Sequence, residues 1–303
     1  MAREWRVKTE PERVAITQLK GSTWLEKDAF PFIGKMPILA IKPSDVLDKV
    51  VRKARGAGRH RHGAPAQAAL RTGVLIRRRH GQRRAGRDAR PKGALATAIK
   101  KQFPAITEPK QAGALVRSIA AYTGRPATVA ALKLSPLVFV RPGELRTAEW
   151  AETGLEAAEW RIPGSKMKMR VDHLVPLSTQ AVELLRSVQP MTGHGQYVFP
   201  SLCTCERPMS ENTINAALRG MGYAKEVHSA HGFRAMAHTI MDEVLGERVD
   251  LMEHQLAHTL EDANGRAYNR TTHLLARRVM IQTWADYLDK LRMGGEVIQL
   301  KAA

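Results

Sequence analysis

The tyrosine in the stretch GRAYNRTTH, residues 265–273, lies between two arginines. Arg266 and Arg270 favour the phenolate form of Tyr268, because a positive charge beside a phenol makes its proton easier to remove. The same guanidinium groups attract phosphate. A tyrosine that attacks a phosphodiester needs both effects, so Tyr268 is a candidate nucleophile.

A second cationic group is expected on a helix. The segment SAHGFRAMAHTIMDEVL, residues 229–245, places its apolar residues on one face when it turns by about 100° per residue. His231 and Arg234 then share the opposite face. They could bind an anion together, or they could belong to the solvated polar face of an ordinary surface helix.

Arg141 and His258 are two further candidates. Arg141 follows the apolar run LSPLVFV, and a guanidinium at the end of a buried segment needs a strong anionic partner. That partner could be a ligand, or Glu144 three residues further on. His258 precedes Tyr268 by ten residues, although a lone histidine is more often structural than catalytic.

A basic turn connects two predicted strands. Apolar patterning indicates strands within WRIPG, residues 160–164, and HLVPLS, residues 173–178, and the turn between them contains SKMKMR. Lys168 in this turn could swing into a neighbouring groove, or it could be one more solvated lysine.

The elements that must position these residues indicate two domains, as expected for a chain of 303 residues. Residues 1–53 read as helices with short breaks. A helix capped by Thr107 indicates a domain boundary near residue 105. A later helix is predicted to be capped by Ser210. The C-terminal stretch 274–292 has an apolar stripe of Met280, Trp284, Tyr287, Leu288 and Leu291.

Residues 54–90 are different in kind. Of these 37 residues, 28 are Arg, Ala, Gly or His, and 11 arginines stand against a single acid, Asp88. Apolar periodicity is nearly absent. The simplest interpretation of this composition is a basic, flexible loop that contacts DNA.

The whole chain carries a formal net charge of +19, and it stays basic without that segment. Such an excess indicates a polyanionic partner, nucleic acid before an anionic membrane surface. No apolar run approaches the ~18 residues of a membrane span, and the charged N-terminus has no signal core, so we expect a cytoplasmic protein. Cys203 and Cys205 cannot complete the four-ligand shell of structural zinc.

Together these residues and their surroundings resemble the tyrosine recombinases, the phage integrase family, and within it the integrases of satellite phages and genomic islands. The resemblance covers about residues 105–292 and is carried by FVRPGELRTAEW, KMKMRVDHLVPLS, YVFPS, RPMSENTINAALRGMGY, HGFRAMA, QLAHTLEDANGRAYNR and WADYLDKLR. The stretch EKDAFPFIGKMPILAI matches the helical domain with which the family binds its core site.

The resemblance implies a mainly α fold with a small antiparallel β-sheet, an α+β class. A helical core-site DNA-binding domain over residues 1–104 would precede a catalytic domain over residues 105–303. The implied partners are double-stranded DNA attachment sites, further copies of the chain in a homotetramer on DNA, and host DNA-bending and directionality proteins. The implied location is the nucleoid.

The resemblance also implies a reaction without a metal ion or cofactor. Tyr268 would attack a DNA phosphate, form a 3′-phosphotyrosine and free a 5′-hydroxyl. Arg141 and Arg234 would clamp the non-bridging oxygens, and His258 would donate a further hydrogen bond to the phosphate.

Two proton transfers complete the implied reaction. Lys168 matches the family's hairpin lysine and would protonate the leaving oxygen, with Lys166 as a rival for this role. His231 would assist proton transfer at the nucleophile. The alternatives to an active recombinase are an integrase remnant that binds DNA without recombining it and a type IB topoisomerase-like enzyme.

Two departures from the family stand out. Nothing in the chain corresponds to the arm-type DNA-binding domain that usually precedes the middle domain. Residues 54–90 also lack the amphipathic helices expected at that place. Their composition is what a GC-rich coding stretch gives in a shifted frame, so we interpret them as an out-of-frame translation, with a genuine Arg-rich DNA-wrapping loop as the alternative.

Overall fold

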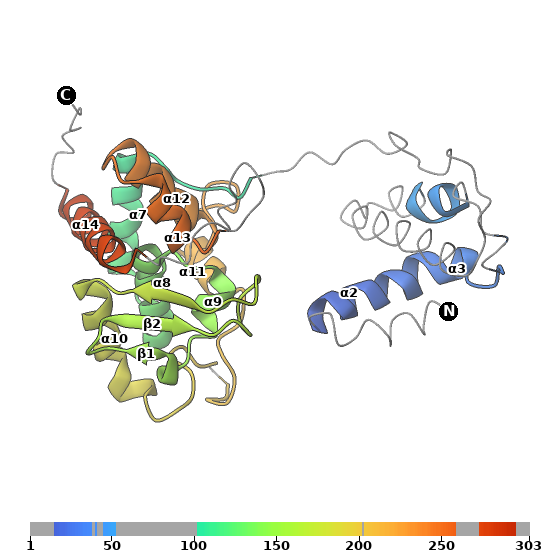
Figure 1. Cartoon of the computed structure of the whole chain (residues 1–303), viewed down its shortest axis with the longest axis horizontal. Coiled ribbons are helices and arrows are strands. Elements are labelled where there is room, and N and C mark those ends of the chain that lie inside the picture. The colour runs from blue at the N-terminus through green and yellow to red at the C-terminus, as the bar shows by residue number, and fades with distance from the viewer. Residues whose placement is uncertain are drawn as a thin grey trace. The chain divides into compact units, whose positions relative to one another are not determined.

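The computed structural model describes residues 15–37, 40, 45–52, 102–201, 203–258 and 273–294 (Figure 1). The chain divides into two compact units, Met1–Ile99 and Lys100–Ala303. The Arg-rich segment 54–90 and the candidate nucleophile Tyr268 lie outside the described residues. Within the described ranges, no helix is long and apolar enough to cross a membrane.

The described part of the first unit is helical. Its elements are α2 (Ala15–Trp24), the π-helical turn η1 (Leu25–Ala29), α3 (Phe30–Ile33) and the π-helical segment η2 (Val46–Arg52). Trp24, Ala29 and Val50 are buried, so these short helices share an apolar contact. Helices were predicted for residues 1–53, whereas binding of a core site by this unit stays a prediction.

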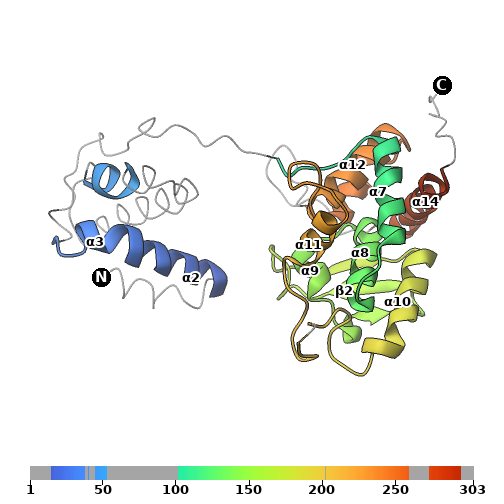
Figure 2. The same ribbon diagram turned by 180° about the vertical axis from the view of Figure 1, so that it is seen from behind.

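The second unit packs a small sheet against helices (Figures 1 and 2). Its elements in chain order are α7 (Pro109–Ala121), α8 (Pro126–Val138), α9 (Pro142–Arg146), η4 (Trp150–Glu152), β1 (Thr153–Gly154), β2 (Glu159–Ile162), β3 (His173–Pro176), α10 (Thr179–Thr192), α11 (Thr213–Gly220), α12 (Gly232–Glu243), α13 (Val249–Gln255) and α14 (Leu274–Met293). The predicted class, mainly α with a small antiparallel sheet, is confirmed.

The sheet has the order β1-β2-β3 and is antiparallel throughout. Trp160 on β2 pairs with Val175 on β3, and both side chains are buried. Large apolar residues that pair across two strands stabilise a sheet through their side-chain contact. Both predicted strands are therefore present, and the basic turn connects them. Helices α8 and α10 pack together on the face of the sheet that Figure 2 turns toward the viewer.

Two helices begin later than predicted. Glu108 rather than Thr107 caps α7, and its carboxylate accepts hydrogen bonds from the backbone N–H groups of Lys110 and Gln111. A carboxylate at this place also faces the positive end of the helix dipole, which a threonine hydroxyl cannot match. Ser210 accepts from the backbone of Asn212, and α11 begins only at Thr213.

The C-terminal helix α14 belongs to the second unit's own core. Trp284 and Leu288 are buried, and Trp284 Nε1 donates to the carbonyl of Pro136 over 2.8 Å. Helix α14 lies beside α7 in both views (Figures 1 and 2), and a Cβ on Gly113 would come within 2.9 Å of the Leu291 carbonyl. The predicted stripe thus packs in cis, against the second unit's own core.

Candidate active site

Arg141 stands where the chain leaves α8 and enters α9. Its Nη1 donates to Oε1 of Glu144 over 2.8 Å, and its backbone N–H donates to the other oxygen of that carboxylate over 2.9 Å. A further contact of 3.4 Å joins Nη2 to the carbonyl of Ala257. The ion pair considered from the sequence is therefore present. A guanidinium has five donors, so these contacts leave Arg141 able to bind a second anion.

Arg234 on α12 is the most deeply buried cation of the site, with a side chain only 6% exposed. Its guanidinium donates to the carbonyls of Phe139, over 3.2 Å, and Leu256, over 2.8 Å. Burial, and next the charge of Arg141, lower the pKa of Arg234 to about 10, so the group stays protonated at neutral pH. Carbonyls orient this charge without neutralising it. The solvated polar face considered from the sequence is wrong for Arg234.

The carbonyl of Phe139 reaches Arg234 through an uncommon backbone conformation. Phe139 ends α8 in the left-handed region, with φ 36° and ψ 35°. This conformation costs a residue with a side chain roughly 1–3 kcal/mol and persists only where the surroundings enforce it. The buried ring of Phe139, packed edge-on against Trp284 at 6.5 Å between centroids, supplies that constraint. Core packing thus positions an acceptor for the site.

His258 extends the site from the end of α13. Its Nε2 lies 3.2 Å from Nη2 of Arg234, and its Nδ1 lies 2.6 Å from Oε2 of Glu253. Ala257, just before it, has a left-handed φ of 49°. The turn that ends α13 therefore brings His258 onto the same guanidinium that the carbonyls of Phe139 and Leu256 hold.

His231 lies directly before α12, which begins at Gly232 rather than at residue 229. Burial, followed by the charges of Arg234 and Arg141, lowers the pKa of His231 against a smaller opposing effect of Glu144. The ring stacks obliquely on Phe103 at 4.3 Å between centroids. A Cβ at Gly232 would come within 2.5 Å of the Pro104 carbonyl, so the glycine beside His231 permits this close approach.

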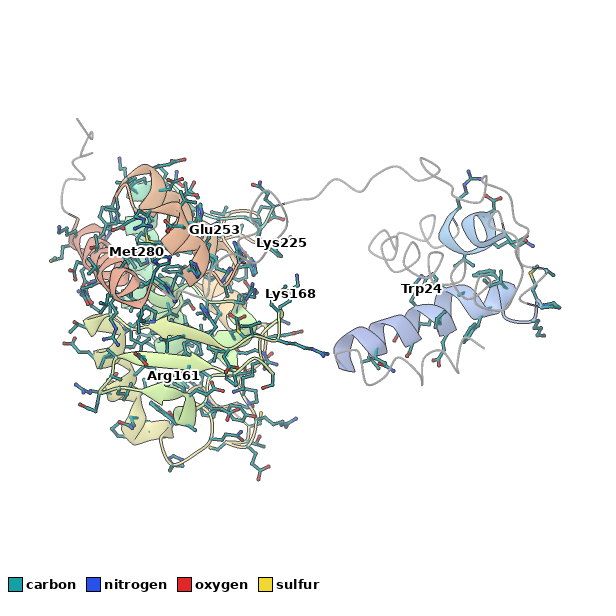
Figure 3. All side chains as sticks on the ribbon, in the orientation of Figure 1. Trp24, Arg161, Lys168, Lys225, Glu253 and Met280 are labelled. Carbon is teal, nitrogen blue, oxygen red and sulfur yellow. The ribbon has the colours of Figure 1, made fainter. Side chains whose placement is uncertain are left out.

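The two rival lysines of the β2–β3 turn have opposite surroundings. Lys166 forms ion pairs with Glu149, at 2.6 Å, and with Glu152, and it donates to the carbonyl of Thr147. Burial lowers the pKa of Lys166, but hydrogen bonds to these two carboxylates outweigh that effect and raise it. Lys168 is exposed, projects from the end of the hairpin (Figure 3), and has no hydrogen-bond or ion-pair partner among the residues described.

The structure thus brings four of the six predicted site residues together. Arg234 contacts His258 directly, and the charges of Arg141 and Arg234 both act on His231. Lys168 lies apart from these contacts on the hairpin, and the position of Tyr268 is outside the described ranges.

The sequence interpretation missed three residues around this cluster. The carboxylate of Glu253 contacts Nδ1 of His258. The spacing of five residues between the two was the only feature of the sequence that indicated this contact. His173 at the start of β3 is 3.1 Å from the Gln255 carbonyl. Burial, then Arg277, lower the pKa of His173 to about 4 with smaller contributions from Arg141 and Arg234. Arg277 donates to Gln255 Oε1 over 2.6 Å.

No three His, Cys, Asp or Glu side chains of the described part are grouped to hold a metal ion.

Two protein families match the chain. The phage integrase family matches residues 107–273, and the phage integrase central domain matches residues 1–70. The integrase of enterobacteria phage P4 is 36% identical over 314 residues, which cover 96% of this chain and 69% of that protein. The putative protein IntB of Escherichia coli strain K12 is 36% identical over 284 residues, which cover 88% of this chain and 70% of that protein.

Solved structures of integrases share the fold. The Tn1549 transposon integrase in complex with transposon right end DNA has a TM-score of 0.65 at 12% identity, over 93% of this chain and 98% of its own. A lambda integrase dimer bound to a COC′ core site has a TM-score of 0.61 at 13% identity, over 85% and 93%. A lambda integrase tetramer bound to a Holliday junction has a TM-score of 0.63 at 13% identity, over 89% and 78%.

The family match and the two sequence relatives favour a recombinase over the binding-only remnant and the topoisomerase-like enzyme. The family match spans more than half of the 303 residues and includes all six candidate site residues. The P4 integrase adds a relative that this chain matches over more than two thirds of its length. The chain belongs to the phage integrase family, and it is a site-specific recombinase of the tyrosine type.

Proposed function

We propose that this chain cuts and rejoins double-stranded DNA at attachment sites, with Arg141, Arg234, His231, His258, Lys168 and Tyr268 as its catalytic residues. The observation that carries the proposal is the pair Arg141 and Arg234. Burial and the charge of Arg141 disfavour the charge of Arg234, and Glu144 is the carboxylate that Arg141 contacts. A phosphate placed between two such guanidiniums relieves this cost and receives directed hydrogen bonds.

In the proposed reaction, the Tyr268 oxygen attacks the phosphorus and the bond to the 5′ oxygen breaks. The arginines and His258 stabilise the charge that builds on the non-bridging oxygens. Lys168 gives a proton to the departing 5′ oxygen. His231 takes the proton of the phenol, a role that its lowered pKa supports because the ring is neutral near pH 7 and offers a lone pair.

The proposed partners follow from charge and from relatives. A net charge of +19 favours contacts with the phosphate backbone. Related integrases have been solved on DNA as a dimer and as a tetramer, which supports a homotetramer of this chain on its attachment DNA. Host DNA-bending and directionality proteins complete the proposed assembly, and binding to the chromosome would locate the chain in the cytoplasm at the nucleoid.

Covalent capture tests the proposal on a pool of duplexes, so no single attachment sequence has to be chosen. The full chain is incubated with nicked duplexes that carry random core sequences, and adducts that survive detergent are recovered and sequenced. We expect the wild-type chain to enrich a defined core sequence, and Tyr268→Phe to yield no adduct while it keeps its affinity for the recovered duplex. If the wild-type chain yields no adduct from any duplex, the proposed reaction is wrong.

Tyr287→Phe is the matched control, because Tyr287 is the next candidate nucleophile. Burial, and then Glu108, raise the pKa of Tyr287, and its hydroxyl oxygen is buried. We therefore expect Tyr287→Phe to form the adduct at the wild-type rate. An adduct from Tyr268→Phe that disappears in the double variant would assign the attack to Tyr287.

A further inference from the structure

Glu253 connects two histidines through the two oxygens of one carboxylate. Its Oε2 lies 2.6 Å from Nδ1 of His258, and its Oε1 lies 3.2 Å from Nε2 of His238 on α12. The Glu253 side chain is 22% exposed, so water screens these contacts only in part. Figure 3 shows Glu253 on α13 in the second unit.

The contacts on the two ring nitrogens of His258 select one tautomer. An ionised carboxylate only accepts hydrogen bonds, so the proton of the ring must be on Nδ1. A guanidinium only donates, so Nε2, which lies 3.2 Å from Nη2 of Arg234, must present its lone pair. The neutral ring with its proton on Nδ1 satisfies both contacts. The other neutral tautomer satisfies neither of them.

The same arrangement prepares His258 for an anion. When a phosphate oxygen takes the place of Arg234 at Nε2, the ring must carry a proton on Nε2 to donate a hydrogen bond. That proton comes from solvent, and the resulting imidazolium has Glu253 on its opposite nitrogen. A carboxylate that accepts from the far nitrogen of a histidine both orients the ring and stabilises its charged form.

We propose that Glu253 is the positioning residue of the active site: it fixes His258 with Nε2 toward the phosphate and stabilises the imidazolium that donates to it. The inference rests on the proposed function for its catalytic consequence, but the tautomer does not depend on that function. The competing explanation is that Glu253 only joins α12 to α13 through His238, a structural role that a neutral glutamine can fill.

The first arm of the test is nitrogen NMR of the full chain without DNA, with labelled histidine and with His258→Gln to assign the signal. We expect the proton on Nδ1 in the wild-type chain and loss of this preference in Glu253→Ala. Glu243→Ala is the matched control, because Glu243 is an exposed glutamate on α12, and it should keep the wild-type signal. A wild-type ring with its proton on Nε2 overturns the inference.

The second arm measures cleavage of the duplex recovered by covalent capture, together with thermal unfolding. We expect adduct formation to fall about 10- to 100-fold in Glu253→Ala, the range typical when the partner that orients a functional histidine is removed. Glu253→Gln should unfold like the wild-type chain and still cleave roughly tenfold more slowly, since the amide cannot stabilise an imidazolium. This variant decides the question if Glu253→Ala does not fold.

The outcomes separate the two proposals. If Glu253→Gln cleaves at the wild-type rate while Tyr268→Phe is inactive, Glu253 is only structural and the inference fails, although the proposed function stands. If the wild-type chain forms no adduct, the proposed function fails, and with it the catalytic half of the inference. The tautomer then still follows from the NMR arm alone.

Discussion

The helical side of the active site and its hairpin side hold their cations in opposite ways. On the helical side, Arg234 is buried and donates to the carbonyls of Phe139 and Leu256. On the hairpin side, Lys168 is exposed and lacks a hydrogen-bond or ion-pair partner within the described ranges. One cation is fixed in advance, whereas the other is free to move.

This difference fits the two tasks that we propose for these residues. Charge that builds on phosphate oxygens is stabilised best by donors that are already in place, because no reorganisation is then needed during the reaction. A proton donor must instead reach the leaving oxygen, and a lysine carries its proton at the end of a flexible chain. Contacts like those between Arg234 and its carbonyls would hold Lys168 in place and prevent it from reaching the leaving oxygen.

The largest expected effect comes from Arg234→Ala on the fixed side. We expect the single-turnover rate of adduct formation to fall by about 10³–10⁵, as when an arginine that stabilises a phosphoryl transition state is lost. Arg234→Lys should restore little, since an ammonium cannot reproduce the planar fork that spans several acceptors. Arg248→Ala, which removes an exposed arginine from the second unit, is the control. If Arg234→Lys keeps nearly full activity, the site needs only a positive charge at this position and not a planar guanidinium.

Lys168→Ala tests the exposed cation on the hairpin side of the active site. We expect cleavage to slow by about 10²–10⁴, because the leaving oxygen loses its proton donor. A duplex with sulfur at the 5′ bridging position should restore the rate, since a thiolate leaves without a proton. Equal defects on the oxygen and sulfur substrates would make Lys168 a phosphate contact.

The matched control for Lys168 is the fixed lysine of the same turn. Lys166→Ala leaves the carboxylates of Glu149 and Glu152 without their shared partner, so we expect it to lower the free energy of unfolding by about 1–2 kcal/mol. Its cleavage defect should be small and should not be relieved by sulfur. Rescue of Lys166→Ala by sulfur would transfer the role of proton donor to Lys166.

A last prediction concerns stability rather than rate, through the pH dependence of the fixed side. Burial, with a smaller contribution from Arg219, lowers the pKa of His228 to about 4, and its Nδ1 accepts from the backbone N–H of Ile106 over 3.1 Å. The unfolded chain binds this proton near pH 6.5, so stability is full above that pH and falls as the pH drops toward 4. The loss is on the order of 3 kcal/mol, and His173 adds a similar slope.

Unfolding in denaturant between pH 7 and pH 4 measures this slope. His228→Gln should flatten it, because a glutamine oxygen can accept from Ile106 without titrating, whereas the exposed His194→Gln should leave it unchanged. The ring of His228 packs edge-on against Phe233, beside Arg234, at 4.6 Å between centroids. If His228→Gln leaves the slope unchanged, protonation of His228 is not the cause of the loss of stability at low pH.

Much of the second unit could be predicted from local patterns. Alternating apolar residues indicated β2 and β3, and a stripe at helical spacing indicated α14. The ion pair of Arg141 with Glu144 was one of the two partners considered from the sequence, because residues three apart at a helix start are neighbours. The first residues of α7 and α11 were predicted incorrectly, because several nearby polar side chains compete to cap a helix.

By itself, the sequence determined which residues are present for the chemistry and which short elements carry them. Only the tertiary structure decided that Arg234 is buried, that Lys166 is bound while Lys168 is exposed, and that Glu253 holds His258. The physical reason is range. Periodicity reports which side of one helix is apolar, whereas the burial of Arg234 depends on a carbonyl 95 residues away, at Phe139. Two lysines two residues apart look alike in the sequence until Glu149 and Glu152 pack beside one of them.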